Sequence, residues 1–263
     1  MRALYTAATG MMAQEKNVEV ISNNVANMRT TGFKRQTVHF QDLLYSHQRR
    51  AGTATSDQNN QAPAGLFVGS GVKTVATPRV MSQGNITMTE RTYDLAIRGE
   101  GFFRVQLPDG RIAFTRDGGF ETDSQGRLTT KDGYLLDPGI TIPQDSTSVS
   151  INAQGQVSAL QPNQVQPQVL GQLNMSRFIN KVGLESIGDN LFVETPGSGA
   201  PIDGAPGSEG FGNLQQGYLE ESNVNSVTEI AAMIQAQRAY ELNSKVISSA
   251  DQMLQATSNL FRG

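Results

Sequence analysis

Few residues of this chain belong to the types that carry catalytic or metal chemistry. The two histidines, His39 and His47, are eight positions apart, whereas two metal ligands on one helix face are usually about four apart. Both are therefore interpreted as surface or interface residues. The sequence contains no cysteine, which excludes disulfide bonds, thiol nucleophiles and thiolate metal sites.

The glycine-rich segment 98–102, RGEGF, is the nearest match to a nucleotide-binding loop. Neither a Lys-Ser/Thr pair nor a complete dinucleotide pattern follows it, so its glycines predict a tight turn before a strand. Three carboxylates that could be considered for catalysis lie close together in the sequence, namely Asp117, Glu121 and Asp123. The preference of aspartate for turns explains why Asp117 is there without a catalytic role. We therefore predict no catalytic residue, no metal site and no cofactor, and a protein that is not an enzyme.

The overall charge argues against a polyanionic partner. The 263 residues carry a formal net charge of -3 at pH 7, and nucleic acids and anionic lipids are bound through an excess of lysine and arginine. A sparse basic cluster, Lys34, Arg35, Arg49 and Arg50, is interpreted as a solvated face or a local interface. No nucleic-acid partner is predicted.

The sequence predicts neither membrane insertion nor a cleaved signal peptide. No stretch approaches the roughly 20 apolar residues that cross a bilayer. Near the N-terminus, Thr6, Thr9 and Gln14 interrupt the apolar core that a signal peptide requires. If the chain is exported, we expect a route that does not cleave a signal.

A seven-residue repeat predicts an amphipathic helix over residues 3–28, with a seam like that of a coiled coil. Gly32 beyond it suits the left-handed conformation that follows helix ends. One row of the repeat consists of Leu4, Met11, Val18 and Val25. The second row, three positions later, consists of Ala7, Gln14, Ile21 and Met28.

A longer amphipathic helix is predicted from Ser226 to about Leu260. Ser226 and Glu229 have the spacing of a capping box, which satisfies free N–H groups of the first helical turn. At about 1.5 Å per residue, this helix would be roughly 50 Å long. Its apolar face is wide and has two adjacent rows, Met233, Tyr240, Ile247, Leu254 and Phe261, and Ala239, Val246, Met253 and Leu260.

Residues 66–195 have the pattern of short antiparallel strands. Turn sequences recur about every eight residues at 108–110, 117–118, 125–126 and 132–133, and Asp-Gly between apolar runs predicts a hairpin. Further strands are predicted at 149–151, 156–160, 168–173 and 191–194. The pattern indicates an antiparallel, sandwich- or barrel-like β-domain.

The predicted fold is therefore mixed α and β, with the two terminal helices paired as a coiled-coil-like domain and an all-β domain inserted between them. We expect a helical assembly domain from residues 1–32 and 226–263, an extended connecting segment at 33–71 and a β-rich outer domain at 72–225. A helix pair covers only part of such a wide apolar face, which favours packing against further molecules.

Several segments resemble the signatures of the bacterial flagellar rod and hook family, and together they extend nearly from end to end. The N-terminal ones are AATGM at 7–11, ISNNVAN at 21–27 and TGFKR at 31–35. The central ones are GEGFF at 99–103 and FTRDG at 114–118. The C-terminal ones are GYLE at 217–220, SNVN at 222–225, MIQ at 233–235, QRAYE at 237–241 and DQML at 251–254.

Within this family, segments 63–72, 141–143 and 183–188 resemble the distal-rod members. The resemblance implies a structural subunit that polymerises helically into a hollow, rigid rod, which transmits torque across the periplasm and passes export substrates. It also implies export through the flagellar type III apparatus without signal cleavage. The alternatives are a proximal-rod or hook subunit of the same family, or a cell-wall binding module.

The implied partners are further copies of the chain, other rod subunits, the hook protein and the surrounding basal-body rings. Segment 46–71 resembles the stretch that bridges rod subunits and keeps the rod straight. Its predicted rod-specific residues are Gln61, Pro63, Gly65, Leu66, Val68 and Gly69. The predicted assembly interface comprises Leu4, Met11, Val18, Ile21, Val25, Met233, Tyr240, Val246, Ile247, Met253, Leu254 and Leu260.

Overall fold

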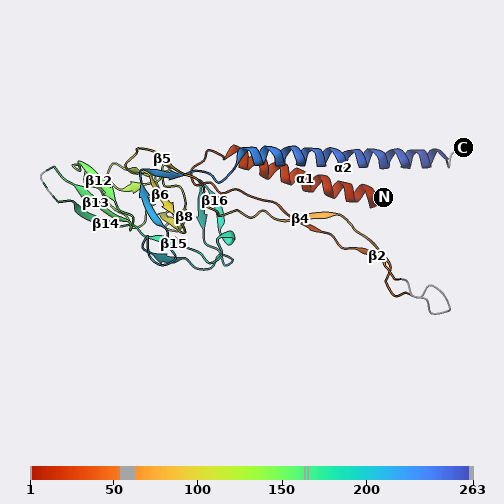
Figure 1. Cartoon of the computed structure of the whole chain (residues 1–263), viewed down its shortest axis with the longest axis horizontal. Coiled ribbons are helices and arrows are strands. Elements are labelled where there is room, and N and C mark those ends of the chain that lie inside the picture. The colour runs from red at the N-terminus through yellow and green to blue at the C-terminus, as the bar shows by residue number, and fades with distance from the viewer. Residues whose placement is uncertain (1, 54–62, 163, 165, 261–263) are drawn as a thin grey trace. The chain divides into compact units, whose positions relative to one another are not determined.

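The computed structural model describes residues 2–53, 63–162, 164 and 166–260, apart from the side chains of residues 258 and 260 (Figure 1). The chain forms two compact units. The first consists of Met1–Val25, Gln36–Pro78 and Ser226–Gly263, and the second consists of Ala26–Arg35 and Arg79–Asn225. The prediction of a mixed α and β fold with paired terminal helices is confirmed.

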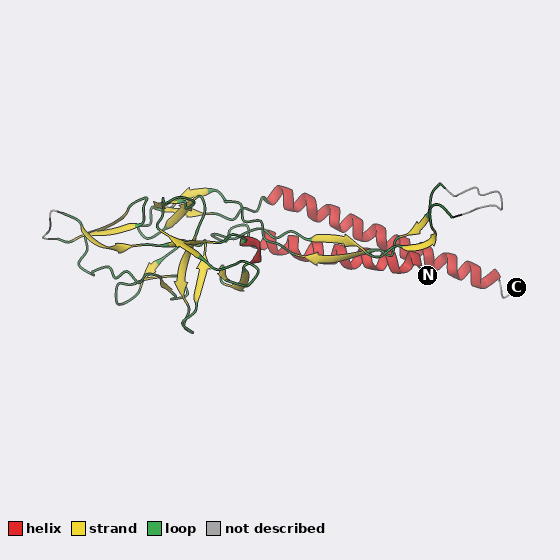
Figure 2. Ribbon diagram, turned by 90° about the horizontal axis from the view of Figure 1, so that it is seen from below, coloured by secondary structure: helices red, strands yellow, loops and turns green. Residues whose placement is uncertain are grey.

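Two long helices that run in opposite directions form the body of the first unit (Figures 1 and 2). They are α1 (Arg2–Ala26) and α2 (Ser226–Leu260). Both agree with the predicted ranges, because heptad periodicity and the residues that start and stop helices are local signals.

An extended β-ribbon belongs to the same unit as the helices. Strand β1 (His39–Asp42) pairs with β4 (Val72–Ala76), and β2 (Ser46–Arg49) pairs with β3 (Leu66–Val68), both antiparallel. The strand β4, which the sequence pattern grouped with the β-rich region, is thus part of this ribbon. Near the junction of its two strand pairs, the Val72 N–H donates to Thr9 Oγ1 of α1 at 3.4 Å.

The second unit is antiparallel β-structure throughout its paired strands. Its largest sheet contains β7 (Phe102–Gln106), β8 (Ile112–Thr115), β9 (Glu121–Thr122), β10 (Leu128–Thr129), β11 (Leu135–Leu136), β15 (Met175–Arg177), β16 (Glu185–Gly188), β17 (Leu191–Val193) and β18 (Ile202–Gly204). Smaller sheets join β12 (Ser148–Ile151), β13 (Gln156–Leu160) and β14 (Gln168–Gln172), then β6 (Leu95–Arg98) with β19 (Asn213–Gln216), and β5 (Ile86–Met88) with β20 (Tyr218–Glu220). A short 3-10 helix spans Lys181–Gly183.

Three of the four predicted hairpin turns are confirmed. Gly110, Gly126 and Gly133 have positive φ and connect β7–β8, β9–β10 and β10–β11. The prediction for Asp117-Gly118 is wrong, because no hairpin forms there. Instead, Gly118 lies against β6, where an added Cβ would be 1.6 Å from the Leu95 carbonyl oxygen.

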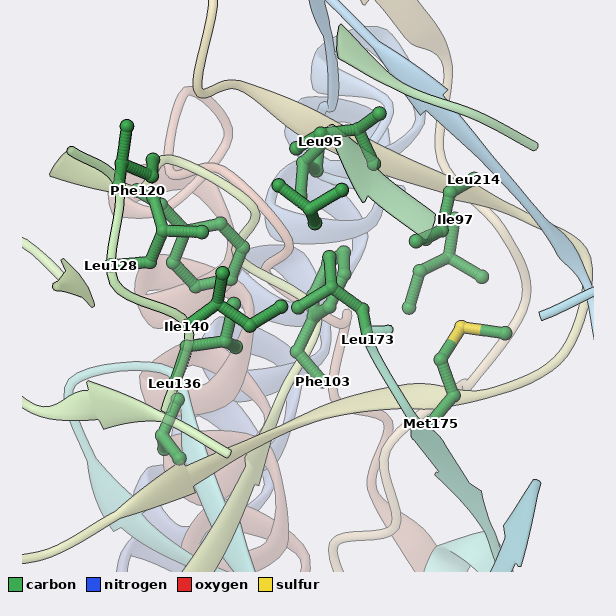
Figure 3. Packing of buried hydrophobic residues seen from close by; sticks show 14 of the residues in the cluster. Leu95, Ile97, Phe103, Phe120, Leu128, Leu136, Ile140, Leu173, Met175 and Leu214 are labelled. Carbon is green, nitrogen blue, oxygen red and sulfur yellow. The ribbon is translucent and has the colours of Figure 1, made fainter. Parts of the chain in front are cut away.

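The hydrophobic core lies in the second unit, and Figure 3 shows its main cluster. Phe103 and Val105 of β7 contribute to this cluster, whereas the neighbouring Phe102 packs with Phe114 and Phe192 in a second one. Alternate side chains of a strand point to opposite faces, so β7 is buried on both sides. Burying each such side chain contributes about 1.5–3 kcal/mol.

Candidate assembly surface

The helices of the first unit meet through small and polar residues. Ala13 of α1 and Ala236 and Ala250 of α2 are buried. At Gly10, an added Cβ would lie 3.0 Å from the side chain of Asn243. The two backbones therefore approach closely, which large side chains in the seam would prevent.

Asn24 connects α1, α2 and the start of the β-ribbon. Its Nδ2 donates to Glu229 Oε2 at 3.0 Å, and both residues are 1% exposed. The same amide exchanges two hydrogen bonds with the backbone of Gln36, at 2.8 and 2.9 Å. Because a buried carboxylate requires hydrogen-bond donors, Glu229 has a tertiary contact that its expected capping role did not include.

These contacts define the register of the helix pair. Gly10 lies two heptads before Asn24, and Asn243 lies two heptads after Glu229. The Asn24–Glu229 hydrogen bond and the Gly10–Asn243 close approach are separated by the same number of heptads on both helices. Only one antiparallel alignment satisfies both contacts, and buried polar residues are known to select the register of paired helices. The seam of α2 is thus the row Glu229, Ala236, Asn243 and Ala250.

The predicted assembly residues of α1 lie in and beside this seam. Ile21 is buried, whereas the others are half-buried: Leu4, Met11, Val18 and Val25. All of them are held on one side of α1 by the heptad repeat. The structure therefore brings the N-terminal set together along the helix pair.

The predicted assembly residues of α2 flank the seam and are largely uncovered. Met233 and Ile247 are half-buried. The exposed members are Tyr240, Val246, Met253 and Leu254, which are 44%, 47%, 65% and 41% exposed. The side chain of Leu260 lies outside the described residues. Exposed apolar rows of this extent on a helix are typical of a surface that another protein covers.

Sequence reasoning missed two of the residues that hold the two helices together, Gly10 and Asn243. Its list of interface residues contains the larger side chains of the heptad rows, whereas Gly10, Ala236 and Asn243 lie where the helices meet. The available signal was the heptad spacing of small and amide residues in both helices, a pattern that permits close backbone approach.

The described rod-specific residues lie in or beside β3, which belongs to the outer pair of strands in the ribbon. Pro63, Leu66 and Gly69 are exposed, Gly65 and Val68 are half-buried, and Gln61 lies outside the described residues. Nearby apolar groups are also exposed: Leu44 by 88%, Tyr45 by 52% and Phe67 by 49%. The His47 ring packs edge-on against Phe67, with centroids 4.9 Å apart.

A buried ionic junction in the second unit joins three of the signature segments. Glu220 accepts hydrogen bonds from Lys34 Nζ at 2.5 Å and from Arg116 Nη1 at 3.2 Å. The side chains of Lys34 and Glu220 are each 1% exposed. Two further hydrogen bonds complete the junction. The Gly84 N–H donates to the Glu220 carboxylate at 2.9 Å, and Lys34 Nζ donates to the Ser82 carbonyl at 2.9 Å.

The junction corrects the interpretation of the basic cluster. Burial lowers the pKa of Lys34, and the Glu220 carboxylate opposes that shift. Burial likewise lowers the pKa of Arg116, again opposed by Glu220. The assignment to a solvated face or local interface is wrong for Lys34, whereas Arg49 and Arg50 are exposed.

The residues considered for catalysis have structural contacts. Asp117 accepts the Gly119 N–H at 2.9 Å, and burial raises the pKa of its carboxyl. Glu121 forms an exposed ion pair with Arg91 at 3.1 Å. The glycines of segment 98–102 have φ of 112° and 138° and form the predicted turn before β7.

The described residues provide neither a metal-binding cluster nor a membrane-spanning helix. No group of three or more His, Cys, Asp or Glu side chains there is arranged to hold a metal ion. None of the described helices is long and apolar enough to span a membrane.

Comparison with known protein families decides the identity. Family models described as flagella basal body rod protein, flagellar hook protein FlgE/F/G D1 domain and flagellar basal body rod FlgEFG protein C-terminal match residues 4–34, 96–159 and 215–260. The chain is 56% identical to the flagellar basal-body rod protein FlgG of Caulobacter vibrioides over 260 residues, covering 99% of both chains. The chain belongs to the flagellar basal-body rod protein family.

Within this family, the chain groups with the FlgG relatives. It is 40% identical to FlgG of Bacillus subtilis over the full length of both chains. It is only 33% identical to FlgF of Caulobacter vibrioides, covering 95% of this chain and 94% of that one. Since FlgG of the same organism is 56% identical, the resemblance is specific within the rod family. The matched segments also include most of α1, all of α2, and the three charged residues of the ionic junction, Lys34, Arg116 and Glu220.

Proposed function

We propose that this chain is a structural subunit of the distal part of the flagellar rod, and that copies of it polymerise helically into a rigid hollow shaft. The observation that carries this proposal is the near full-length identity of 56% to a flagellar basal-body rod protein FlgG. The uncovered apolar rows beside the helix seam support self-assembly, because a stable monomer rarely leaves such rows in water.

We assign a different role in the polymer to each of the two units. The helix pair supplies the contacts between subunits, through the rows that contain Tyr240 and Val246. The β-domain forms the outer part, and the ribbon segment 46–71 bridges neighbouring subunits to stiffen the shaft. Leu44 and Phe67, both exposed on the ribbon, support this role.

The proposed setting is the periplasmic part of the basal body, which the chain reaches through flagellar export without signal cleavage. Its partners there are other rod subunits, the hook protein and the surrounding rings. In this position the shaft transmits motor torque and passes export substrates through its lumen. Such a role requires specific surfaces and no chemical step, consistent with membership of a structural family.

Complementation tests the proposal. The chain is expressed in a flagellated bacterium that lacks its own FlgG relative, and swimming and isolated basal bodies are examined by light and electron microscopy. We expect restored swimming, complete rods and the chain within them. Basal bodies with complete rods that do not contain the chain, in cells that express it, would contradict the proposed function.

A further inference from the structure

The C-terminal end of α2 has no helix beside it within its own subunit. In the register of the helix pair, Gly10 of α1 lies beside Asn243 of α2. One heptad further, Ala3 lies beside Ala250, which is buried, and every described side chain that follows it in α2 is exposed. Residues 251–260 (the overhang) therefore continue past the start of α1, over about 15 Å at 1.5 Å per residue, as Figure 1 shows.

The overhang presents an acidic, an apolar and an amide side chain on one face. Asp251 is followed after three residues by Leu254 and after four by Gln255, a spacing that places all three on the same side of a helix. Leu254 is 41% exposed, and the other two are also exposed. Because so short a helical segment is marginal in water by itself, we expect another molecule to cover this face.

A groove of about 300 Å³ lies between the start of α1 and the β-ribbon. Tyr5, which is 60% exposed, and Val68 provide its apolar surface, and Arg2 supplies a positive charge. The rest of its lining includes three hydroxyl side chains, Thr6, Ser46 and Ser70. The groove thus offers a cation, an apolar surface and hydrogen-bonding groups within one small site.

The charges of Arg2 and Asp251 have no opposite charge close by within one copy. The described residues three and four positions away from each of them on its own helix are uncharged. Arg2 precedes Ala3 and Asp251 follows Ala250, so in an antiparallel pair that turns by about 100° per residue they project to opposite sides. Neither residue takes part in an ion pair within the described chain.

We propose that the groove receives the overhang of a second copy of the chain, with Leu254 of that copy against the exposed ring of Tyr5. Asp251 of the second copy then faces Arg2, and its Gln255 reaches the hydroxyl groups of the groove. The occupant is identified by charge complementarity and by the helical end that lacks a partner in its own subunit. The inference rests on the proposed function, and it assigns one contact between neighbouring subunits.

The contact has a consequence for the type of assembly. Arg2 and Asp251 face opposite sides of the helix pair, so the contact joins two different surfaces and is heterologous. A heterologous contact generates rings or open helical polymers rather than closed twofold dimers. For two copies in the same orientation, the receiving copy is displaced along the helix axis in the direction of the overhang. Such a displacement favours a helical shaft over a flat ring.

Disulfide cross-linking tests the contact directly, because the chain contains no cysteine. The full-length variant with Thr6→Cys and Gln255→Cys is expressed in the strain in which the unmodified chain restores swimming. Within one copy, Thr6 is level with Ile247, and Gln255 lies about 12 Å further along the helix axis. A disulfide spans roughly 7 Å at most between Cα atoms, so mild oxidation should link different copies and give a ladder of multimers.

The cross-link has matched controls. Each single-cysteine variant alone should give no ladder. Thr6→Cys with Ala256→Cys should also give none, because Ala256 is exposed and faces away from Asp251 and Leu254 on the same helical end. Absence of the ladder in swimming cells, or equal ladders from the two double variants, overturns the contact while the proposed function stands.

Exchange of the two charges gives an independent test. Arg2→Glu alone and Asp251→Arg alone should each abolish swimming, since each brings like charges together in the contact. Arg2→Glu with Asp251→Arg in the same chain should restore it. Failure of the combined variant to restore swimming, or normal swimming of both single variants, overturns the contact. Failure of the unmodified chain to restore swimming refutes the proposed function instead.

Discussion

Asn24 and Glu229 are 205 residues apart in the sequence, and the Asn24 amide donates a 3.0 Å hydrogen bond to the Glu229 carboxylate inside the helix pair. The bond lies in the seam of small and polar residues between α1 and α2 rather than among large apolar side chains. It combines with Gly10 and Asn243 to define one antiparallel register.

Replacing Asn24 with alanine should therefore weaken the helix pair. The change removes a donor to a buried carboxylate and two hydrogen bonds with Gln36, and such losses cost about 1–3 kcal/mol. Urea unfolding followed by circular dichroism at the helical wavelength measures the loss. The exposed Gln235→Ala on α2 is the control; equal stability of both variants would refute a role for the Asn24 contact.

Gly118→Ala should destabilise the β-domain. A Cβ there would lie 1.6 Å from the Leu95 carbonyl oxygen, so backbone must move, and overpacking of this kind costs about 1–3 kcal/mol or more. Gly139→Ala is a matched control, because no heavy atom lies within 4 Å of the added Cβ. Thermal unfolding should separate the two variants, and the same melting temperature for both would contradict the close approach.

Lys34→Met should cost far more than an equivalent change at the surface. It leaves Glu220 in the interior with one of its two cationic partners removed, and breaking a buried ion pair costs about 3–5 kcal/mol. Lys16→Met breaks the exposed Lys16–Glu19 pair and should cost less than about 1 kcal/mol. Chemical unfolding of both variants gives the comparison, and similar losses would show that the junction adds no stability.

Asp123 should make the stability of the second unit depend on pH. The Arg127 N–H and guanidinium hydrogen bonds, with the Gln125 N–H, hold the pKa of its carboxyl below the ordinary value of 3.8. The folded-state pKa is lowered, so the stabilisation is present above about pH 4 and is lost as the pH falls through the folded pKa. Asp123→Asn should therefore lower the melting temperature at pH 6, and this loss should shrink as the pH falls below about 4. A constant difference across this range would contradict the assignment.

Charge on the uncovered rows of α2 should block assembly without unfolding the monomer. Val246 and Leu254 are 47% and 41% exposed in the single chain, but burying an unpaired charge in a subunit contact is costly. Val246→Asp and Leu254→Asp should abolish swimming while leaving the circular dichroism spectrum unchanged. Gln252→Asp, at an exposed polar position, is the control, and normal swimming of the first two variants would remove these rows from the interface.

Sequence reasoning predicted the features that depend on neighbouring residues. The ends of α2 and the turns at Gly110, Gly126 and Gly133 are specified by local patterns. It missed the contacts that residues make with partners far away in the sequence. Lys34 meets Glu220 across 186 residues, and nothing in the flanking sequence distinguishes it from the exposed Arg49. Gly118 was misread for the same reason, because Leu95 lies on another strand.

The rows of the candidate assembly surface follow from periodicity, but their partners do not. Heptad periodicity placed Tyr240 and Val246 on rows of α2 that are exposed in the single chain, but periodicity alone does not say which row touches the partner helix. That choice depends on side-chain size, since Gly10 and Ala236 allow an approach that larger residues forbid. The groove lined by Tyr5 and Val68 combines a helix with the ribbon and emerges only once the two are aligned.

The pairing of β5 with β20 also has a consequence for protein engineering. The Glu221 N–H donates to the Asn85 carbonyl at 2.8 Å, so the β-rich segment between these residues begins and ends at adjacent points. A segment whose two ends are one hydrogen bond apart can be exchanged for a foreign domain with closely spaced termini. Grafting between residues 85 and 221 would thus alter the outer part of each subunit and retain the sequence of the ribbon and of both terminal helices.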